Sequence, residues 1–208
     1  MPIIRLALLC ALLGLLPVAA SSQAAASDAD WISALRQGGY VIVFRHAPFT
    51  TQTVDDLNKM RKAGAEKQLS SEGRALAKSI GDSMHKLAIP VAQVLTSSLQ
   101  RAVDTGTLLG FGEITKSPEV TEADAAATPA DNERRAEAFR KLVSVAPPAG
   151  SNVVIVTHKP NIVDAFGKDW GDVHECDASV FKPDGNGGYK LIVRIPAGEW
   201  GKLAQASN

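Results

Sequence analysis

Two arginines and two histidines, Arg45, His46, Arg101 and His158, are the residues of this sequence best suited to chemistry. Guanidinium groups pair with phosphate oxygens through two parallel hydrogen bonds, and an unprotonated imidazole can act as a nucleophile near neutral pH. Arg45 and His46 follow an apolar run, and so does His158. If the four side chains meet, they form a cationic pocket that suits a dianionic phosphate group.

Three short apolar runs predict the strands that would bring these side chains together. The runs cover residues 41–44, 91–95 and 153–156, and continuous β-branched runs of this length are typical of parallel strands buried on both faces. Polar residues follow each run. Because the carboxyl ends of parallel strands meet at one edge of a sheet, we expect these polar groups to lie at that edge.

Helical patterns lie between and after these strands. Apolar residues at helical spacing predict a helix over 71–87, with Ser70 or Ser71 available as the N-cap. Two further helices are predicted over 99–109, with Arg101 in the first turn, and over 132–145. The alternation of strands and helices indicates the α/β class.

The last part of the chain has a different pattern. Strands predicted over 178–181 and 189–195 flank a Gly-rich turn and should pair as an antiparallel hairpin at the sheet edge. The full prediction is a three-layer α/β/α fold with a mostly parallel mixed sheet and this C-terminal hairpin. Residues 47–69 are expected to form a long loop over the site with room for a short helix, and 123–131 to form either a lid or a flexible linker.

The N-terminal segment has the pattern of a secretory signal peptide. Arg5 precedes an apolar stretch over 6–18, and small residues follow it. We predict a signal peptide over 1–26, with cleavage after Ala20 as the alternative, and a single domain over 27–208. A retained membrane anchor is disfavoured because the apolar stretch is shorter than the roughly 20 residues that a bilayer requires. The protein is therefore expected to be periplasmic or secreted.

Composition limits the partners of this chain. The 22 basic and 22 acidic residues balance, so no overall field favours nucleic acid, and no stable membrane insertion is expected after signal cleavage. The sequence has no zinc-spaced Cys/His cluster, no Walker loop and no dinucleotide glycine motif. We expect a small-molecule phosphate ester or a phosphoprotein as the partner and no cofactor; oligomeric state is not predicted. Cys176 is the only cysteine left after cleavage, which precludes an intramolecular disulfide.

The sequence resembles the histidine phosphatase superfamily, which has the phosphoglycerate-mutase-like fold, in its secreted or periplasmic bacterial form. Four motifs in the family's order carry the resemblance: Arg45-His46-Ala47 for Arg-His-Gly, Leu69-Ser70-Ser71-Glu72-Gly73 for Leu-Ser-x-x-Gly, Ser97-Ser98-Leu99-Gln100-Arg101 through Thr105 for the second arginine motif, and Thr157-His158 for the second histidine. Ala47 departs from the family's glycine, which costs little if the backbone there has negative φ.

The resemblance implies a catalytic role for each of these residues. His46 would attack phosphorus to form a phosphohistidine, while Arg45, Arg101 and His158 hold the phosphate oxygens, without a metal. Neighbouring arginines should lower the pKa of His46 and keep it unprotonated. A carboxylic acid would protonate the leaving oxygen, and Glu122 in Val120-Thr121-Glu122 is the first choice, with Asp124 as a substitute.

Other polar residues have two interpretations each. Ser97 or Ser98 either donates a hydrogen bond to phosphate or caps the following helix, and Lys159 either binds phosphate or is a solvated loop lysine. Glu175 can approach the pocket from the loop before the hairpin. A metal site around His174 is disfavoured, because adjacent residues seldom converge on one ion.

These observations predict a metal-independent phosphatase, a phosphoric monoester hydrolase that acts through a phosphohistidine on His46. One alternative is a non-catalytic phosphate-ester or protein-binding module on the same fold. The other is a phosphomutase, against which the signal peptide argues. The substrate itself is not predicted.

Overall fold

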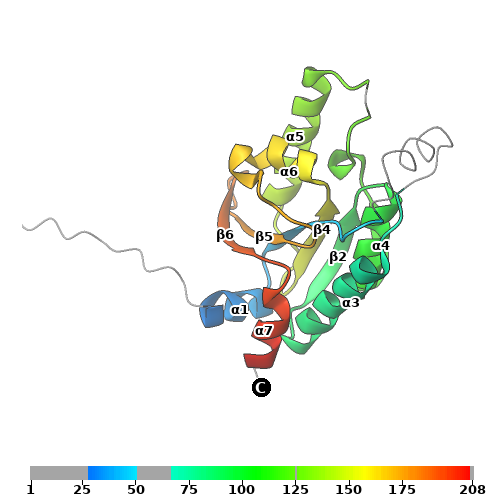
Figure 1. Ribbon diagram of the computed structural model, residues 1–208. Coiled ribbons are helices and arrows are strands. Elements are labelled where there is room, and N and C mark those ends of the chain that lie inside the picture. Colours follow the sequence, from blue (N-terminus) through cyan, green and yellow to red (C-terminus); the bar gives the residue numbers. More distant parts are fainter. Residues whose placement is uncertain (1–27, 51–66, 125, 207–208) are drawn as a thin grey trace, which may run out of the picture.

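The structure, a computed structural model, describes residues 28–50, 67–124 and 126–206 (Figure 1). Its centre is a six-stranded sheet with the order β3-β2-β4-β1-β5-β6. The strands are β1 (Val41–Arg45), β2 (Val91–Thr96), β3 (Ile114–Lys116), β4 (Asn152–Thr157), β5 (Ala178–Pro183) and β6 (Tyr189–Ile195). The first four are parallel, and β5 and β6 form an antiparallel hairpin beside β1. The predicted mixed sheet with its C-terminal hairpin is confirmed.

Helices cover both faces of this sheet (Figure 1). One face carries α1 (Asp28–Gln37), α3 (Ser71–Lys86), α4 (Gln100–Leu108) and α7 (Glu199–Ala206). The other carries α5 (Pro129–Ser144) and α6 (Lys159–Phe166), with the short 3-10 helices η1 (Pro118–Val120) and η2 (Lys168–Trp170) at its margins. The predicted three-layer α/β/α arrangement is confirmed.

The central strands β1 and β4 supply both hydrophobic cores. Side chains alternate between the faces of a strand, so Ile42 and Phe44 pack with α3 and α7, whereas Val41 and Val43 pack with α5 and α6. Every residue of β4 is buried. The continuous apolar runs are therefore explained by two covered faces, as predicted.

Strand β2 departs from that expectation at its start. Ala92 and Gln93 are exposed, and the pairing register with β4 shifts between Val91 and Gln93. The prediction of a strand buried on both faces is wrong for these residues, because β3 pairs only with the second half of β2. The buried half begins at Val94, on the side where the polar residues follow.

Helix α5 begins at Pro129, three residues earlier than predicted. Thr128 is its N-cap and forms a capping box with Asp131. The predicted irregular segment thus ends at Thr128. Among the described residues, the helices α1, α6 and α7, the strand β3 and the 3-10 helices η1 and η2 were not predicted.

The polar segment 47–69 is described only at its two ends. Phe49 pairs with Leu69 through an isolated antiparallel bridge, which brings those ends together. The predicted short helix in this loop falls mainly on 51–66 and lies outside the described residues, as does the predicted signal peptide over 1–26. Within the part of the chain that the structure describes, no helix is long and apolar enough to cross a membrane.

Candidate active site

The carboxyl ends of β1, β4 and β2 are held at one level by backbone hydrogen bonds. The His46 N–H donates to the Thr157 carbonyl at 2.9 Å, and the Ser97 N–H donates to the Val156 carbonyl at 2.9 Å. The residues that follow these three strands therefore emerge side by side at one sheet edge, as the sequence predicted.

The turn after β1 fixes the imidazole of His46. The buried Ala47 N–H donates to Thr105 Oγ1 at 2.9 Å, and the Ala47 carbonyl lies 2.8 Å from His46 Nδ1. Ala88 and Cys176 are the non-glycine residues with positive φ in the described ranges, so Ala47 has negative φ. With this negative φ, alanine can stand at position 47, where the motif it resembles has glycine, at little cost in backbone strain.

Gly73 allows helix α3 to approach this turn closely. A Cβ at Gly73 would lie 2.0 Å from the Pro48 carbonyl oxygen, and the same oxygen accepts from the Ser70 N–H at 3.1 Å. Ser70 is the N-cap of α3, and its side chain accepts from the Gly73 N–H at 3.0 Å. The Leu-Ser-x-x-Gly pattern thus anchors the chain two residues after His46.

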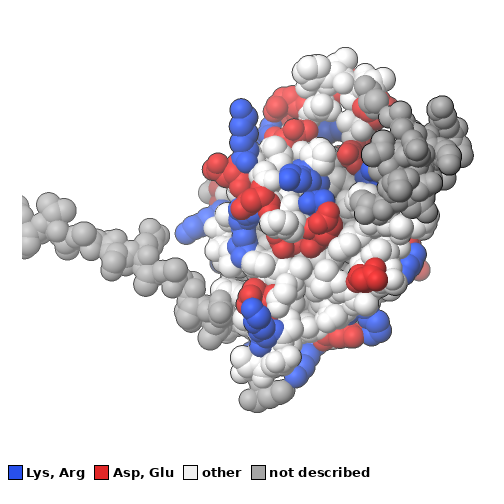
Figure 2. Space-filling model, in the orientation of Figure 1, with Lys and Arg blue, Asp and Glu red and all other residues white. Residues whose placement is uncertain are grey.

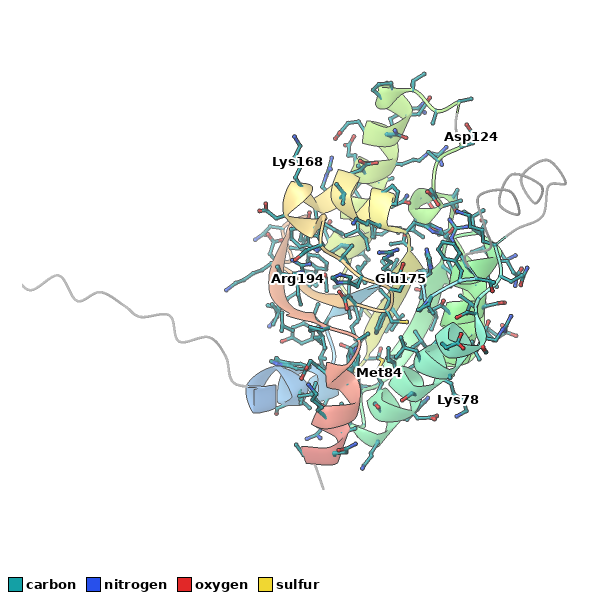
Figure 3. All side chains as sticks on the ribbon, viewed as in Figure 1. Lys78, Met84, Asp124, Lys168, Glu175 and Arg194 are labelled. Atoms are coloured by element: carbon teal, nitrogen blue, oxygen red, sulfur yellow. The ribbon has the colours of Figure 1, made fainter. Side chains whose placement is uncertain are left out.

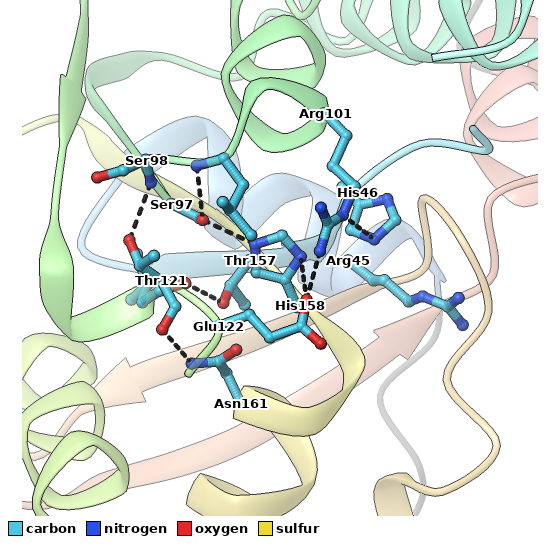
Figure 4. Close-up of polar contacts among 12 residues, drawn as sticks. Arg45, His46, Ser97, Ser98, Arg101, Thr121, Glu122, Thr157, His158 and Asn161 are labelled. Atoms are coloured by element: carbon cyan, nitrogen blue, oxygen red, sulfur yellow. Dashed lines mark hydrogen bonds and ion pairs between the residues drawn. The ribbon is translucent and has the colours of Figure 1, made fainter. Parts of the chain in front are cut away.

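Four of the predicted residues come together in front of the strand ends (Figure 4). Arg101, in the first turn of α4 as predicted, donates from Nε to His46 Nε2 at 3.3 Å and forms an ion pair with Glu122. Glu122 Oε2 lies 3.6 Å from His158 Nδ1. The ring centroids of His46 and His158 are 5.1 Å apart.

Arg45 has a different environment. Its guanidinium forms an ion pair with Glu175 and donates to the Val173 carbonyl at 2.8 Å. In Figure 4 its side chain extends away from the group around His46 and Arg101. Glu175 thus reaches Arg45 from the loop before the hairpin and holds it at the edge of the site, but Glu175 itself does not line the pocket that contains His46.

These groups line a common pocket of ≈ 160 Å³. Besides Arg45, His46, Arg101, Glu122 and His158, it is lined by Phe49, Lys67, Lys159 and Pro160. Four of the lining side chains are cationic and one is a carboxylate, so the pocket favours an anion. Lys159 lines this pocket and is half-buried, and its predicted contact with phosphate stays a prediction.

Both histidines are buried and held in the neutral form. Burial chiefly lowers the pKa of His46 to about 4, with the charges of Arg101 and Arg45 adding to the effect. Burial again comes first for His158, where Arg101 and His46 contribute to a pKa of about 2. The predicted direction for His46 is correct, but desolvation exceeds the arginine charges as its cause.

The hydrogen-bond partners define which nitrogen of each ring is available. The Ala47 carbonyl can only accept, so His46 Nδ1 carries the hydrogen and Nε2 presents its lone pair to the pocket. His158 Nε2 lies 2.7 Å from Ser97 Oγ, which also accepts from the Leu99 N–H at 3.1 Å. Ser97 therefore both supports the start of the second arginine motif and orients His158. Neither the buried Ser97 nor the exposed Ser98 is among the residues that line the pocket, so the predicted contact of Ser97 with phosphate stays a prediction.

The two candidate acids differ in position. Glu122 lines the pocket of His46, whereas Asp124 does not, and its Oδ1 accepts from the Ala126 N–H at 2.8 Å. Figure 3 shows Asp124 on the loop that leads to α5. The geometry therefore favours Glu122. No described residues form a group of three or more His, Cys, Asp or Glu side chains that could hold a metal ion.

Solved structures that are similar to this chain include phosphatases of the histidine phosphatase superfamily. The protein histidine phosphatase SixA, complexed with tungstate, has 15% identity and a TM-score of 0.53, over 77% of this chain and 98% of that chain. A phosphoserine phosphatase mutant from Entamoeba histolytica in complex with phosphoserine has 11% identity and a TM-score of 0.54, over 76% and 97%. The mycobacterial glucosyl-3-phosphoglycerate phosphatase has 16% identity and a TM-score of 0.51, over 74% and 97%.

Comparison by sequence finds no counterpart. No protein-family model matches the chain, and no curated protein matches it. At these identities, the solved structures show that the chain has the phosphoglycerate-mutase-like fold of the histidine phosphatases.

Proposed function

We propose that this protein is a metal-independent phosphatase that hydrolyses a phosphate monoester through a phosphohistidine on His46. The observation that carries the proposal is the position of His46 Nε2, which carries no hydrogen, lies in a cationic pocket and accepts a 3.3 Å hydrogen bond from Arg101 Nε, a donor that a phosphate oxygen can take over. The phosphatases among the structural neighbours support the same class of activity.

The first chemical step uses the neutral imidazole. His46 Nε2 attacks phosphorus, the N–P bond forms, and the P–O bond to the leaving group breaks. When the phosphate group takes over the contacts of Arg101, the carboxyl of Glu122 leaves its ion pair and carries the proton that it gives to the leaving oxygen. Positive charge develops on the ring and is stabilised by the hydrogen bond from Nδ1 to the Ala47 carbonyl. Arg101 exchanges its contact with Nε2 for one with a phosphate oxygen.

The second step returns the enzyme to its starting state. Water attacks the phosphohistidine, Glu122 accepts its proton, and the N–P bond breaks to release inorganic phosphate. His158 stays neutral and donates from Nδ1 to the transferred phosphoryl group, while the lysines Lys67 and Lys159 add positive charge at the rim. Because these side chains neutralise the phosphoryl oxygens, the proposed step needs no metal ion.

Trapping the intermediate tests this proposal. Purified protein lacking residues 1–26 is mixed with ³²P-labelled aryl phosphate in EDTA, quenched and assayed for acid-labile, base-stable label. Wild type should release phosphate and carry label, whereas His46→Ala should lose at least ~10⁴-fold in rate and carry none. Equal rates for the two proteins would refute the assignment of His46. Binding of phosphate without turnover would indicate the non-catalytic module.

We also propose that the chain is exported to the periplasm or secreted. The support is the sequence of residues 1–26, with its basic start, apolar stretch and small-residue end. Expression of the full chain in a Gram-negative host, followed by fractionation and N-terminal sequencing, should yield a periplasmic or extracellular protein that begins at Ser27 or close to it. A full-length cytoplasmic protein would contradict export.

A further inference from the structure

A second cavity adjoins the phosphate pocket and shares two of its walls. It measures ≈ 190 Å³ and lies between the loop after η1, the first half of α5 and the start of α6. Glu122 and Pro160 line both cavities. Because Glu122 is the proposed proton donor to the leaving oxygen, the leaving group must lie on the Glu122 side of the phosphate and can extend into this second cavity.

The charged side chains of the second cavity are mostly carboxylates. Three carboxylates, Glu122, Asp124 and Asp164, face one cation, Arg135, which is held by the Thr121 carbonyl at 3.4 Å. The charge of this cavity is thus opposite to that of the phosphate pocket beside it. Figure 2 shows that acidic and basic side chains are interspersed over the visible face of the protein, so this contrast is local to the two cavities.

Asn161 adds a buried acceptor without a partner. The residue is 7% exposed, and its Nδ2 donates to the Thr121 carbonyl at 3.1 Å, which fixes the orientation of the amide (Figure 4). Oδ1 is then turned away from Thr121, and it has no hydrogen-bond partner among the described residues. A buried acceptor in this state is costly unless a donor reaches it, and Asn161 lines the cavity that a ligand could enter.

We infer that this second cavity is a subsite for the leaving group and that it selects phosphate monoesters of amino alcohols, whose protonated amine contacts Asn161 Oδ1, Asp164 and Asp124. The inference rests on the proposed phosphatase function and specifies its substrate class. The phosphate dianion occupies the cationic pocket, the ammonium group supplies donors to the acceptors of the acidic cavity, and Glu122 lies between the two at the leaving oxygen.

Matched pairs of esters test the subsite. Values of kcat/KM are measured for aminoethyl phosphate against n-propyl phosphate, and for aminopropyl phosphate against n-butyl phosphate. In each pair a terminal ammonium replaces a methyl group at constant length. We expect the better of the two amines to be preferred over its alkyl partner by ~10-fold or more, the effect of one charge-assisted hydrogen bond. Phosphoglycolate, which places a carboxylate there, should be the poorest substrate.

Two variants identify the residues responsible. Asp164→Asn should reduce the ratio of amine to alkyl kcat/KM at least ~5-fold, since it removes a charge from the cavity. Asp169→Asn, the same change at an exposed residue of η2 that does not line the cavity, should leave both the ratio and the hydrolysis of phenyl phosphate unchanged.

The outcomes separate this inference from the proposed function. Hydrolysis of phenyl and alkyl phosphates without a preference for the amines overturns the subsite and leaves the phosphatase intact. A preference for phosphoglycolate also overturns it and indicates that Arg135 binds an anion there. Failure to hydrolyse any of these esters, including phenyl phosphate, overturns the phosphatase proposal and the inference together.

Discussion

The turns after β1 and β4 each place a buried neutral histidine in the same pocket, but they offer different nitrogens. A backbone carbonyl, that of Ala47, holds Nδ1 of His46 and leaves Nε2 to the pocket. A side-chain hydroxyl, that of Ser97, holds Nε2 of His158 and leaves Nδ1 on the side of Glu122. The hydrogen-bond partner of each ring, rather than its burial, therefore separates the proposed nucleophile from the proposed phosphate ligand.

The largest effect in this comparison is expected from removal of His158, which should lower kcat but still allow His46 to form the covalent intermediate. His158→Ala deletes one donor to the transferred phosphoryl group but keeps His46, so kcat should decrease by ~10²–10³-fold, as for the loss of one such donor in other enzymes. Rapid-quench assays with ³²P-labelled aryl phosphate should still detect a labelled protein. The exposed His85, on α3, provides the control, since His85→Ala should retain full activity.

Loss of labelling in His158→Ala would contradict the division of roles between the two histidines. That result would place His158, rather than His46, at the covalent step. A labelled His158→Ala together with an unlabelled His46→Ala would support the roles that the hydrogen bonds indicate.

A smaller effect should follow from loss of the Ser97 hydroxyl. Ser97→Ala removes the 2.7 Å contact that orients His158 but leaves both imidazoles in place, and kcat should decrease ~10-fold with little change in KM. Ser98→Ala is the matched control, because this neighbouring serine is exposed, whereas the buried Ser97 holds the contact with His158. Equal effects of the two substitutions would show that Ser97 does not act through His158.

Much of the site could be predicted because local patterns place its residues. The apolar runs before Arg45 and before Thr157 fix two strand ends, and the strand-to-helix order places Arg101 in the first turn of α4. Alternating strands and helices then require a parallel sheet whose carboxyl ends converge. No long-range contact had to be known for these inferences.

Other features depend on contacts between distant segments. Ser97 and His158 are in contact although they are 61 residues apart in the sequence. The path of the chain after η1 decides that Glu122, and not Asp124, pairs with Arg101. Sheet pairing also decides two features of the strands, namely the three-residue strand β3 and the exposed start of β2. Segments this short carry no apolar periodicity from which they could be predicted.

The smallest effect concerns stability and tests whether both rings are neutral. The pKa of His46 is lowered to about 4 and that of His158 to about 2, whereas an unfolded histidine has its ordinary value of 6.5. The unfolded state therefore binds protons first as pH decreases, and the stability present above pH 6.5 is lost progressively below it. Between pH 7 and pH 5.5 each histidine should cost about 1 kcal/mol of unfolding free energy.

Urea denaturation of wild type and of His158→Ala at these two pH values measures this cost. The wild type should lose about 2 kcal/mol between pH 7 and pH 5.5, and the variant about 1 kcal/mol, since one depressed histidine remains. His85→Ala, a change at an exposed histidine outside the pocket, serves as the control substitution. If His158→Ala lost as much stability as wild type between these pH values, the ring of His158 would have to bind a proton equally in the folded and unfolded states. Its burial would then no longer explain a neutral ring that donates a hydrogen bond beside Glu122.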